Sequence, residues 1–309
     1  MAGNNMQILE GKVAFITGGG SGVGLGQAKV FARAGMKIAI ADIRADHRQV
    51  AIDWFAEHGF PLLPLDLDIT DRQAYAEAAD EVEARLGPVQ FLGNSGGVSQ
   101  FGPIQNATYE DWDWQLGVNL GGVINGVQTF VPRMIAAGLG GHICNTASMA
   151  AFTSAPTGGI YCTSKFAVRG LTECLRYDLE PKGIGVSLLC PGGVNSNIHE
   201  AVLTRPAKYA NTGYYGADPE RMKQLKAVIE GGMDPEQLAQ YVLKAVLENQ
   251  LYVLPYPEFR DRLDAIHQRY VDALAKPEDD PTMEERVRRE RAAMSESMRT
   301  RMADAEKAD

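Results

Sequence analysis

Residues 12–26 read KVAFITGGGSGVGLG, which is a short apolar run of strand-forming residues followed by a glycine-rich turn. Residues 27–35 have the character of a helix that ends at a glycine, and residues 37–42 form a second apolar run. Glycines let the backbone approach a pyrophosphate closely, and the N–H groups and dipole of a helix N-terminus attract its charge. The stretch therefore predicts a strand–helix–strand unit that binds a dinucleotide.

Two details of this unit sharpen the prediction. The glycines follow the pattern T-G-x-x-x-G-x-G on Thr17, Gly18, Gly22 and Gly24, and not a strict G-x-G-x-x-G. Asp42 ends the second run twenty residues after Gly22, where a carboxylate can accept hydrogen bonds from the adenosine ribose hydroxyls. A flexible glycine loop without a ligand is the alternative, but such a loop need not lie between a strand and a helix or precede Asp42.

Beyond Asp42, strand-like and helix-like segments alternate along the chain. This alternation predicts an α/β fold of the Rossmann type, with a doubly wound parallel sheet. Ligands of such a sheet bind at the carboxyl ends of its strands. We expect further strands at residues 61–67, 89–93, 142–146 and 185–190, and helices at residues 48–58, 72–86, 109–137 and 160–179.

A second group of residues indicates proton-transfer chemistry. Tyr161 and Lys165 are four positions apart in an expected helix, so they share one of its faces. A neighbouring positive charge should lower the tyrosine pKa, which suits a group that takes a proton from an alcohol. Ser148 follows an expected strand, and its hydroxyl could hold the same substrate oxygen. An isolated Tyr-x-x-x-Lys pair is more often an aromatic beside a solvated lysine. Here the glycine-rich turn, Asp42 and Ser148 in the same chain favour catalysis.

Together these motifs resemble the classical short-chain dehydrogenase/reductase family over residues 9–256. The resemblance implies that the catalytic residues are Asn119, Ser148, Tyr161 and Lys165, that Asn119 supports a proton relay, and that no metal is required. It also implies a cofactor site formed by Thr17, Gly18, Ser21, Gly22, Val23, Gly24, Asp42, Arg44, Asp68, Ile69, Asn94, Gly96, Tyr161, Lys165, Pro191, Gly192, Val194 and Ser196.

The chain departs from the family pattern at two places. The family's N-N-A-G turn is Asn94-Ser95-Gly96-Gly97 here, which should leave this turn looser without abolishing cofactor binding. Ser196 replaces a threonine, and it keeps the hydroxyl, so we expect little consequence there.

Four stretches are similar to those of the Cα-dehydrogenases of bacterial lignin β-aryl ether catabolism, a group within this family; they are residues 111–114, 117–126, 205–209 and 251–258. This resemblance implies NAD-linked oxidation of a benzylic secondary alcohol to the ketone. Two alternatives stay open, namely an NADPH-linked reductase of bulky ketones and a non-catalytic dinucleotide-binding protein. The complete set of catalytic residues argues against the second alternative.

Cofactor choice favours NAD. Asp42 would repel a 2′-phosphate, and the glycine-rich loop has no basic residue at Gly20 or Ser21. Arg44 and Arg48 leave NADP open, because either guanidinium could turn toward a 2′-phosphate.

Residues 197–233 are expected to form a lid over the substrate, because long loops inside compact domains often close active sites. The segment is irregular and aromatic, Tyr215 included, and it directly follows Ser196. With Phe101 it should help to form a roomy, partly aromatic pocket that suits a bulky aromatic alcohol. The expected lining residues are Met149, Phe152, Tyr209 and Tyr214.

Composition limits the remaining possibilities. The net charge of −9 argues against a nucleic-acid partner, no apolar run is long enough to span a membrane, and the N-terminal residues do not form a signal peptide. The four cysteines lack metal-ligand spacing and should be reduced and buried. We expect a cytoplasmic enzyme with a small-molecule substrate. By resemblance to the family it should be a homodimer or homotetramer, joined through helices 109–137 and 160–179. Residues 257–309 should form a helical extension with a charged tail from residue 277.

Overall fold

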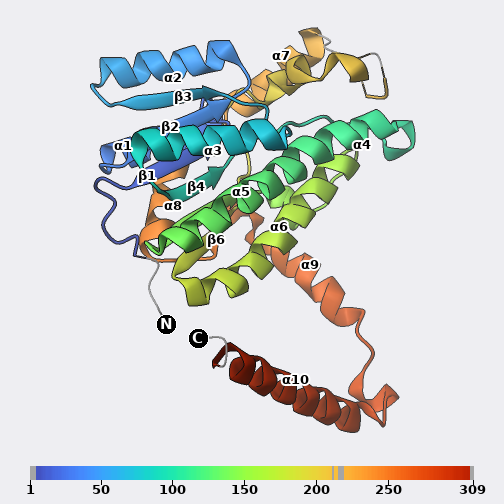
Figure 1. Cartoon of the computed structure of the whole chain (residues 1–309). Coiled ribbons are helices and arrows are strands. Elements are labelled where there is room, and N and C mark those ends of the chain that lie inside the picture. The colour runs from blue at the N-terminus through green and yellow to red at the C-terminus, as the bar shows by residue number, and fades with distance from the viewer. Residues whose placement is uncertain (1–4, 211, 215–218, 307–309) are drawn as a thin grey trace. The chain divides into compact units, whose positions relative to one another are not determined.

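A single parallel sheet organises the protein. The computed structural model describes residues 5–210, 212–214 and 219–306, and within them seven strands pair in the order β3-β2-β1-β4-β5-β6-β7 (Figure 1). The strand order reverses beside β1, so connections leave β1 and β4 in opposite directions, and a ligand-binding crevice is expected there. The strands are β1 (Val13–Thr17), β2 (Lys37–Asp42), β3 (Leu62–Asp66), β4 (Val89–Asn94), β5 (Gly141–Thr146), β6 (Ile184–Leu189) and β7 (Tyr252–Val253).

The central strands are apolar because helices cover both faces of the sheet. Every residue of β1 and of β6 is buried, which is the pattern of a strand packed on two sides. On one face Phe15 of β1 meets the rings of Tyr75 and Phe130 at centroid distances of 5.9 and 4.8 Å. These contacts fix the central strands against the helices that follow them.

Eight helices accompany this sheet in the described part of residues 5–258. Helix α1 packs against α8, α3 against α5, and α4 against α6. The helices are α1 (Gly22–Arg33), α2 (Ala45–Glu57), α3 (Arg72–Leu86), α4 (Tyr109–Leu116), α5 (Gly122–Ala137), α6 (Gly159–Leu179), α7 (Pro219–Glu230) and α8 (Pro235–Leu247).

The predicted alternation of strands and helices is confirmed, with three differences. The helix expected at residues 27–35 begins earlier, at Gly22, because the last glycines of the turn already lie in its first turns. The single helix expected over residues 109–137 is interrupted by a π-helical turn, Gly117–Gly121. Helix α8 was not predicted, although Asp234 caps it by accepting the N–H groups of Glu236 and Gln237 at 2.9 Å.

The segment expected to be an irregular lid contains short helical turns. After Ser196 the chain forms two 3-10 turns, η5 (Ile198–Thr204) and η6 (Ala207–Tyr209), before α7 begins. Residues 211 and 215–218, and therefore Tyr215, lie outside the described residues. The described part of this segment is thus more regular than its composition suggested. Its role as a lid stays a prediction, and the name "lid" below means only the described residues of 197–233.

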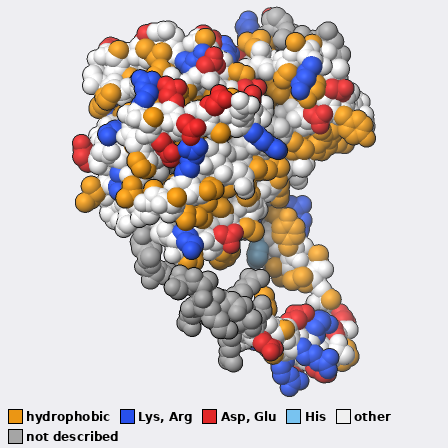
Figure 2. All heavy atoms as spheres, in the orientation of Figure 1, with side chains coloured by type: hydrophobic (Ala, Val, Ile, Leu, Met, Phe, Trp, Pro, Cys, Tyr) orange, Lys and Arg blue, Asp and Glu red, His pale blue; other side chains and the backbone are white. Residues whose placement is uncertain are grey.

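The chain divides after Glu258 into two compact units. The second unit consists of α9 (Arg260–Asp272), a 3-10 turn and α10 (Met283–Glu306). Figure 2 shows closely spaced acidic and basic side chains on α10, where Arg289 pairs with Glu285 one turn earlier. A charged, largely exposed helix therefore occupies the tail, and the domain boundary at residue 256 stays a prediction.

Two further expectations concern the cysteines and membrane-spanning helices. Cys144, Cys162 and Cys190 are buried and unpaired, whereas Cys174 is exposed, so the expectation of burial is wrong for that residue. No helix in the described part of the chain has the length and apolar character needed to cross a membrane.

Candidate active site

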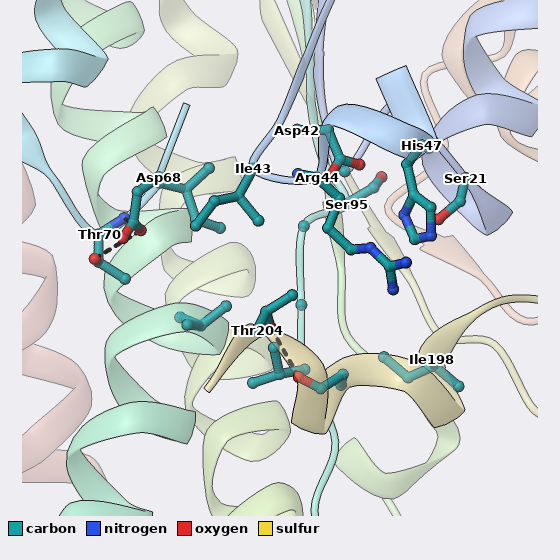
Figure 3. A pocket seen from close by; sticks show the side chains of 18 of the residues that line it. Ser21, Asp42, Ile43, Arg44, His47, Asp68, Thr70, Ser95, Ile198 and Thr204 are labelled. Carbon is teal, nitrogen blue, oxygen red and sulfur yellow. Dashed lines mark hydrogen bonds between the residues drawn. The ribbon is translucent and has the colours of Figure 1, made fainter. Parts of the chain in front are cut away.

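A cavity of about 460 Å³ opens where β1, β2 and β4 end. Figure 3 shows Asp42 and Arg44 on one side of it and Ile198 and Thr204 of the lid on the other. Most residues expected to bind the cofactor line this cavity, namely Gly18, Ser21, Gly22, Val23, Gly24, Asp42, Arg44, Asp68, Ile69, Gly96 and Ser196. The carboxyl ends of the strands thus gather these residues although they are spread over the sequence.

The glycine-rich turn lies too close to other chain segments for side chains. Gly22 has a φ of +47°, and a Cβ there would lie 2.8 Å from Cβ of Ser196. A Cβ on Gly18 would lie 2.9 Å from the backbone of Gly96. Ser21, the N-cap of α1, makes no side-chain capping bond, so N–H groups of the first turn can donate to an anion. This cradle fits a pyrophosphate.

Asp42 is held in place by backbone donors. Its two carboxylate oxygens accept the N–H groups of Gly20 at 3.1 Å and of Arg44 at 3.0 Å. A carboxylate has about four lone-pair sites, so both oxygens retain capacity for ribose hydroxyls. Asp68 is ordered in a similar way, because its Oδ1 accepts both the N–H and the hydroxyl of Thr70 at 2.9 and 2.7 Å.

The turn after β4 is tied down on several sides. Thr17 Oγ1 accepts the N–H groups of Ser95 and Gly96, both at 3.1 Å. The hydroxyl of Ser95 accepts from Gln27 Nε2 at 3.1 Å and lies 3.0 Å from Thr146 Oγ1. The expected loosening of this turn is therefore not seen, because Ser95 supplies hydrogen bonds in place of the family's asparagine.

Two of the expected cofactor residues, Thr17 and Asn94, support the site from behind and do not line the cavity. Asn94 is buried, and its Nδ2 donates to Asn145 Oδ1 at 2.8 Å. This bond joins the ends of β4 and β5, which carry the turn and Ser148. Both residues thus position the neighbours that face the ligand space.

Asn119 lies in the π-helical turn between α4 and α5 and is completely buried. Its Oδ1 accepts the N–H of Val98 at 2.8 Å, and its Nδ2 donates to Val98 O at 2.9 Å and to Ser164 Oγ at 3.1 Å. Short π-helical segments often occur at functional sites. Here the turn lets one amide connect the loop after β4 to α6, the helix that carries Tyr161.

Ser148, Tyr161 and Lys165 come together as expected from their spacing. Ser148 Oγ accepts the N–H of Ala150 at 3.1 Å and donates to Pro191 O at 3.4 Å, and it lies near enough to Tyr161 to affect the pKa of that phenol. The Lys165 ammonium lies 5.6 Å from the centre of the Tyr161 ring and donates to Thr146 O at 3.1 Å. One hydroxyl, one phenol and one ammonium therefore lie together at the carboxyl end of β5.

Burial reverses the expected direction of the tyrosine shift. Desolvation raises the pKa of Tyr161, and the nearby Ser148 side chain offsets this only in part. Desolvation also lowers the pKa of Lys165 to about 8. The expected net lowering of the Tyr161 pKa is thus not seen, because burial disfavours the charged form of each group.

The segment after β6 is anchored but mostly outside the cavity. Pro191 O accepts the N–H of Met149 at 2.8 Å, and Tyr256 Oη donates to Gly193 O at 3.1 Å. Val194 pairs with Met233 in an isolated parallel bridge. Of the four residues expected here, Ser196 lines the cavity and Pro191, Gly192 and Val194 do not.

The four expected substrate residues lie in three places. Tyr209 lines the main cavity. Tyr214 lines a second pocket of about 330 Å³ together with Phe101, whose ring centroid is 5.4 Å from that of Tyr161. Met149 and Phe152 line neither of these two cavities; Met149 is buried, and Phe152 packs under the Arg169 guanidinium at 4.2 Å.

A buried ion pair that the sequence did not reveal fixes the lid to α4. Arg205 Nη1 lies 2.7 Å from Asp111 Oδ1, and the two side chains are only 2% and 0% exposed. Arg205 also donates to Gln100 Oε1 at 2.7 Å, while Asp111 accepts the N–H of Tyr214 at 3.1 Å. Gly213 has a φ of +59°, and a Cβ there would lie 1.7 Å from Asp111 Oδ2. Both charged residues fall in stretches noted above, but residues 94 positions apart carry no local pairing signal.

The chain is similar in sequence to known proteins. The sequence profile described as short chain dehydrogenase matches residues 12–206. The chain is 47% identical over 277 residues to a C alpha-dehydrogenase of Sphingobium sp. (strain NBRC 103272 / SYK-6), covering 89% of this chain and 90% of that protein.

Two solved structures are similar as well. The apo form of LigO from Sphingobium sp. strain SYK-6 shares 51% identity, with a TM-score of 0.77 over 93% of this chain and 97% of that one. A short chain dehydrogenase/reductase from Burkholderia phymatum in complex with NAD shares 32% identity, with a TM-score of 0.82 over 89% and 98% of the two chains.

Replacing Asp111 with asparagine should release the lid, because Arg205 would keep its charge in a buried place without a carboxylate. Removing one partner of a buried pair costs about 3–5 kcal/mol. We expect faster hydrogen exchange in residues 198–210 by mass spectrometry, together with a lower Tm. The control E81Q breaks an exposed pair with Arg85 and should cost less than about 1 kcal/mol. If hydrogen exchange in residues 198–210 were unchanged in D111N, the Arg205–Asp111 pair would not be what holds the lid in place.

The burial of Lys165 predicts a pH dependence of stability. Its pKa is about 8 in the folded chain and about 10.4 when unfolded, so the unfolded state binds more protons between these values. The contribution of Lys165 to stability therefore rises with pH across this window and is lost as pH falls through 8. In denaturant titrations without cofactor, K165M should remove up to about 1.4 kcal/mol of this rise per pH unit.

The matched control for this titration is K226M, which alters an exposed lysine of α7. It should retain the wild-type slope. If K165M instead ran parallel to the wild type between about pH 8 and 10, Lys165 would not be desolvated in the folded chain.

Proposed function

The chain belongs to the short-chain dehydrogenase family, and on that premise we propose that it oxidises a bulky, benzylic secondary alcohol to the ketone with NAD, as in Cα oxidation of lignin β-aryl ethers. It is an alcohol oxidoreductase of the short-chain type with a nicotinamide dinucleotide cofactor. The observation that carries the proposal is the meeting of three side chains at the end of β5: Lys165 lies 5.6 Å from the centre of the Tyr161 ring, Ser148 lies near enough to affect the pKa of Tyr161, and the Phe101 ring centroid is 5.4 Å from that of Tyr161. Proton-transfer groups and an aromatic surface thus meet at one point.

The residues at the strand ends suit the parts of a dinucleotide. The turn from Gly18 to Gly24 would hold the pyrophosphate, Asp42 the adenosine ribose, and Asp68 and Ile69 the adenine. The segment from Pro191 to Ser196 would lie beside the nicotinamide. Bound there, the nicotinamide would accept a hydride from the carbinol carbon of the alcohol.

The protein's own side chains then manage the proton. Tyr161 takes the hydroxyl proton of the alcohol as general base, and Ser148 donates a hydrogen bond to the same oxygen. Lys165 holds the nicotinamide ribose: Thr146 O accepts one of its N–H groups, and an ammonium has three. Asn119 supports a water-mediated route by which the proton leaves. Because burial raises the pKa of Tyr161, its ionisation depends on the Lys165 charge being present.

Existing ion pairs favour NAD over NADP. Arg48 Nη1 donates to Asp66 Oδ1 at 2.8 Å and to Asp42 O at 2.7 Å. Arg44 is paired with Asp46 and Glu200. Both cations that could have bound a 2′-phosphate are therefore already engaged, and Asp42 would repel that group.

An aromatic substrate is supported by the second pocket and by the relatives. Phe101 and Tyr214 line that pocket, and Tyr214 Oη donates to Pro103 O at 2.9 Å, which fixes its ring. We propose that an aryl group of the substrate lies there, next to Phe101, whose ring packs against that of Tyr161. The similar Sphingobium protein is named as a C alpha-dehydrogenase, which fits oxidation at a carbon next to an aryl ring.

We also propose a homodimer or homotetramer joined through α4–α5 and α6. Ile124 and Ile135 on α5 and Phe166 and Tyr177 on α6 are exposed, so these helices offer apolar surface to a second copy. The cysteines are unpaired, which fits a reducing compartment and a cytoplasmic location. For domain organisation we propose a dehydrogenase domain at residues 9–256 followed by an extension at residues 257–309.

The direct test is the absorbance of reduced nicotinamide with purified protein, NAD or NADP, and a panel of secondary alcohols. The panel contains a lignin-type β-aryl ether dimer, simpler benzylic alcohols and aliphatic alcohols of similar size. We expect fast NAD-linked oxidation of the dimer, slower oxidation of the small benzylic alcohols and little reaction with the aliphatic ones. Activity only with NADP, or equal activity on the aliphatic alcohols, would overturn the proposal.

Replacing Tyr161 with phenylalanine should lower kcat by about 10²–10⁴-fold or more, because the general base is lost. NAD binding measured by calorimetry should remain within a few fold of the wild type. Y177F serves as control, since Tyr177 is exposed on the same helix, and should keep full activity. Substantial turnover by Y161F would exclude Tyr161 as the base.

A further inference from the structure

A carboxylate of the lid reaches the edge of the ribose site. Glu200 lies in η5 and lines the main cavity. Its Oε2 is 2.6 Å from Arg44 Nη1 and 3.5 Å from His47 Nε2. Arg44 follows β2 and is 156 positions away in sequence. The lid thus brings a negative charge to the strand end that carries Asp42.

The Arg44 guanidinium is held from two sides. Its Nε donates to Asp46 Oδ1 at 3.0 Å and its Nη2 to Asp46 Oδ2, while Nη1 is taken by Glu200. Asp46, in α2, binds the Nε and Nη2 side of the guanidinium and does not line the cavity. Glu200 does line the cavity. A guanidinium is the preferred partner of a phosphate because two of its N–H groups match two phosphate oxygens. Glu200 occupies the Nη1 donor that lies nearest the lid.

Two carboxylates therefore border the position that the adenosine 2′-substituent would take. The Arg44 N–H donates to Asp42 Oδ1 at 3.0 Å, so Asp42 and the Arg44–Glu200 pair are adjacent. A 2′-phosphate carries a charge of about −1.5 to −2 near neutral pH, by analogy with other phosphomonoesters. It would meet both carboxylates, and to replace Glu200 on Nη1 of Arg44 it would have to displace this carboxylate and with it the lid.

We propose that Glu200 is a specificity-determining residue that, together with Asp42, selects NAD against NADP. The proposal rests on the NAD-dependent function proposed above. A 2′-hydroxyl leaves the Glu200–Arg44 pair intact, so the lid can close on NAD. A 2′-phosphate separates the pair, so the lid opposes NADP. The choice of cofactor is thus made partly by a segment outside the strand–helix–strand unit.

The test uses nucleotide fragments, so it needs no turnover. Binding of 5′-AMP and of adenosine 2′,5′-bisphosphate is measured by calorimetry for the wild type and for E200Q. The wild type should bind the bisphosphate at least about tenfold more weakly than 5′-AMP, and E200Q should reduce this ratio by about tenfold, which is about 1.4 kcal/mol. The ratio of kcat/KM for NAD and NADP should shift in the same direction.

Two further variants distinguish the effect of the Glu200 charge from the effect of any change in the ion pairs of Arg44. D46N removes the other partner of Arg44 from outside the cavity and should change the binding ratio by less than about threefold, since an exposed pair is strongly screened. R44M added to E200Q should cancel the gain in bisphosphate affinity. An equal effect of D46N, or a gain that survives R44M, would overturn the role of Glu200.

The outcomes distinguish this inference from the proposed function. A wild type that prefers the bisphosphate would remove the NAD assignment itself. A wild type that prefers 5′-AMP, with an unchanged ratio in E200Q, would leave the NAD function standing and refute the inference. Binding of 5′-AMP by the variant reports that it is folded, and E200A provides a second removal of the charge if E200Q is not.

Discussion

A charged amine held inside the protein is the constraint on which the active site depends. Lys165 is only 5% exposed, and burial brings its pKa to about 8. Burial of an ammonium is costly unless hydrogen bonds compensate for it, and here Thr146 O at the end of β5 supplies one. The cost of burying this ammonium explains why the elements around it must be fixed in position. The end of β5, the loop after β4 and the first turns of α6 must all stay in place to keep the ammonium near Tyr161.

The lid has two electrostatic anchors of different character. Just after η5, Arg205 forms a fully buried pair with Asp111 of α4, which is strong only while both partners are present. Nearer its start, Glu200 pairs with Arg44 in a partly exposed position, where the pair is weaker and easier to exchange. One anchor therefore fixes the lid to the body of the protein, and the other lies where the cofactor would be sensed. Such a pair of anchors suits the response to the cofactor that we propose for this segment.

Much of the fold was predictable because its signals are local. The apolar run at residues 13–17, the glycines after it and Asp42 at the end of β2 belong to one continuous stretch, and the family assignment that they suggested is confirmed by the profile match. The spacing of Tyr161 and Lys165 likewise needs only helical geometry. Helix α8 could also have been predicted, since Asp234-Pro235-Glu236 is a strong start signal.

The remaining features depend on contacts between distant parts of the chain. The sign of the Tyr161 shift follows from burial, which no spacing reveals. The Arg205–Asp111 and Arg44–Glu200 pairs join residues about a hundred or more positions apart. Ser95 looked like a loss of hydrogen bonding, yet it gains Gln27 and Thr146 as partners only because the ends of β4 and β5 converge beside α1.

The two outermost strands of the sheet have a consequence for self-association. β3 lies at one edge and contains Pro64, which has no N–H to donate, and β7 at the other edge is only two residues long. An exposed strand edge is a template on which another chain can add a strand and begin to aggregate. Proline and extreme shortness are the devices by which natural sheets blunt that template. This sheet is therefore protected against edge-to-edge growth at both of its outermost strands.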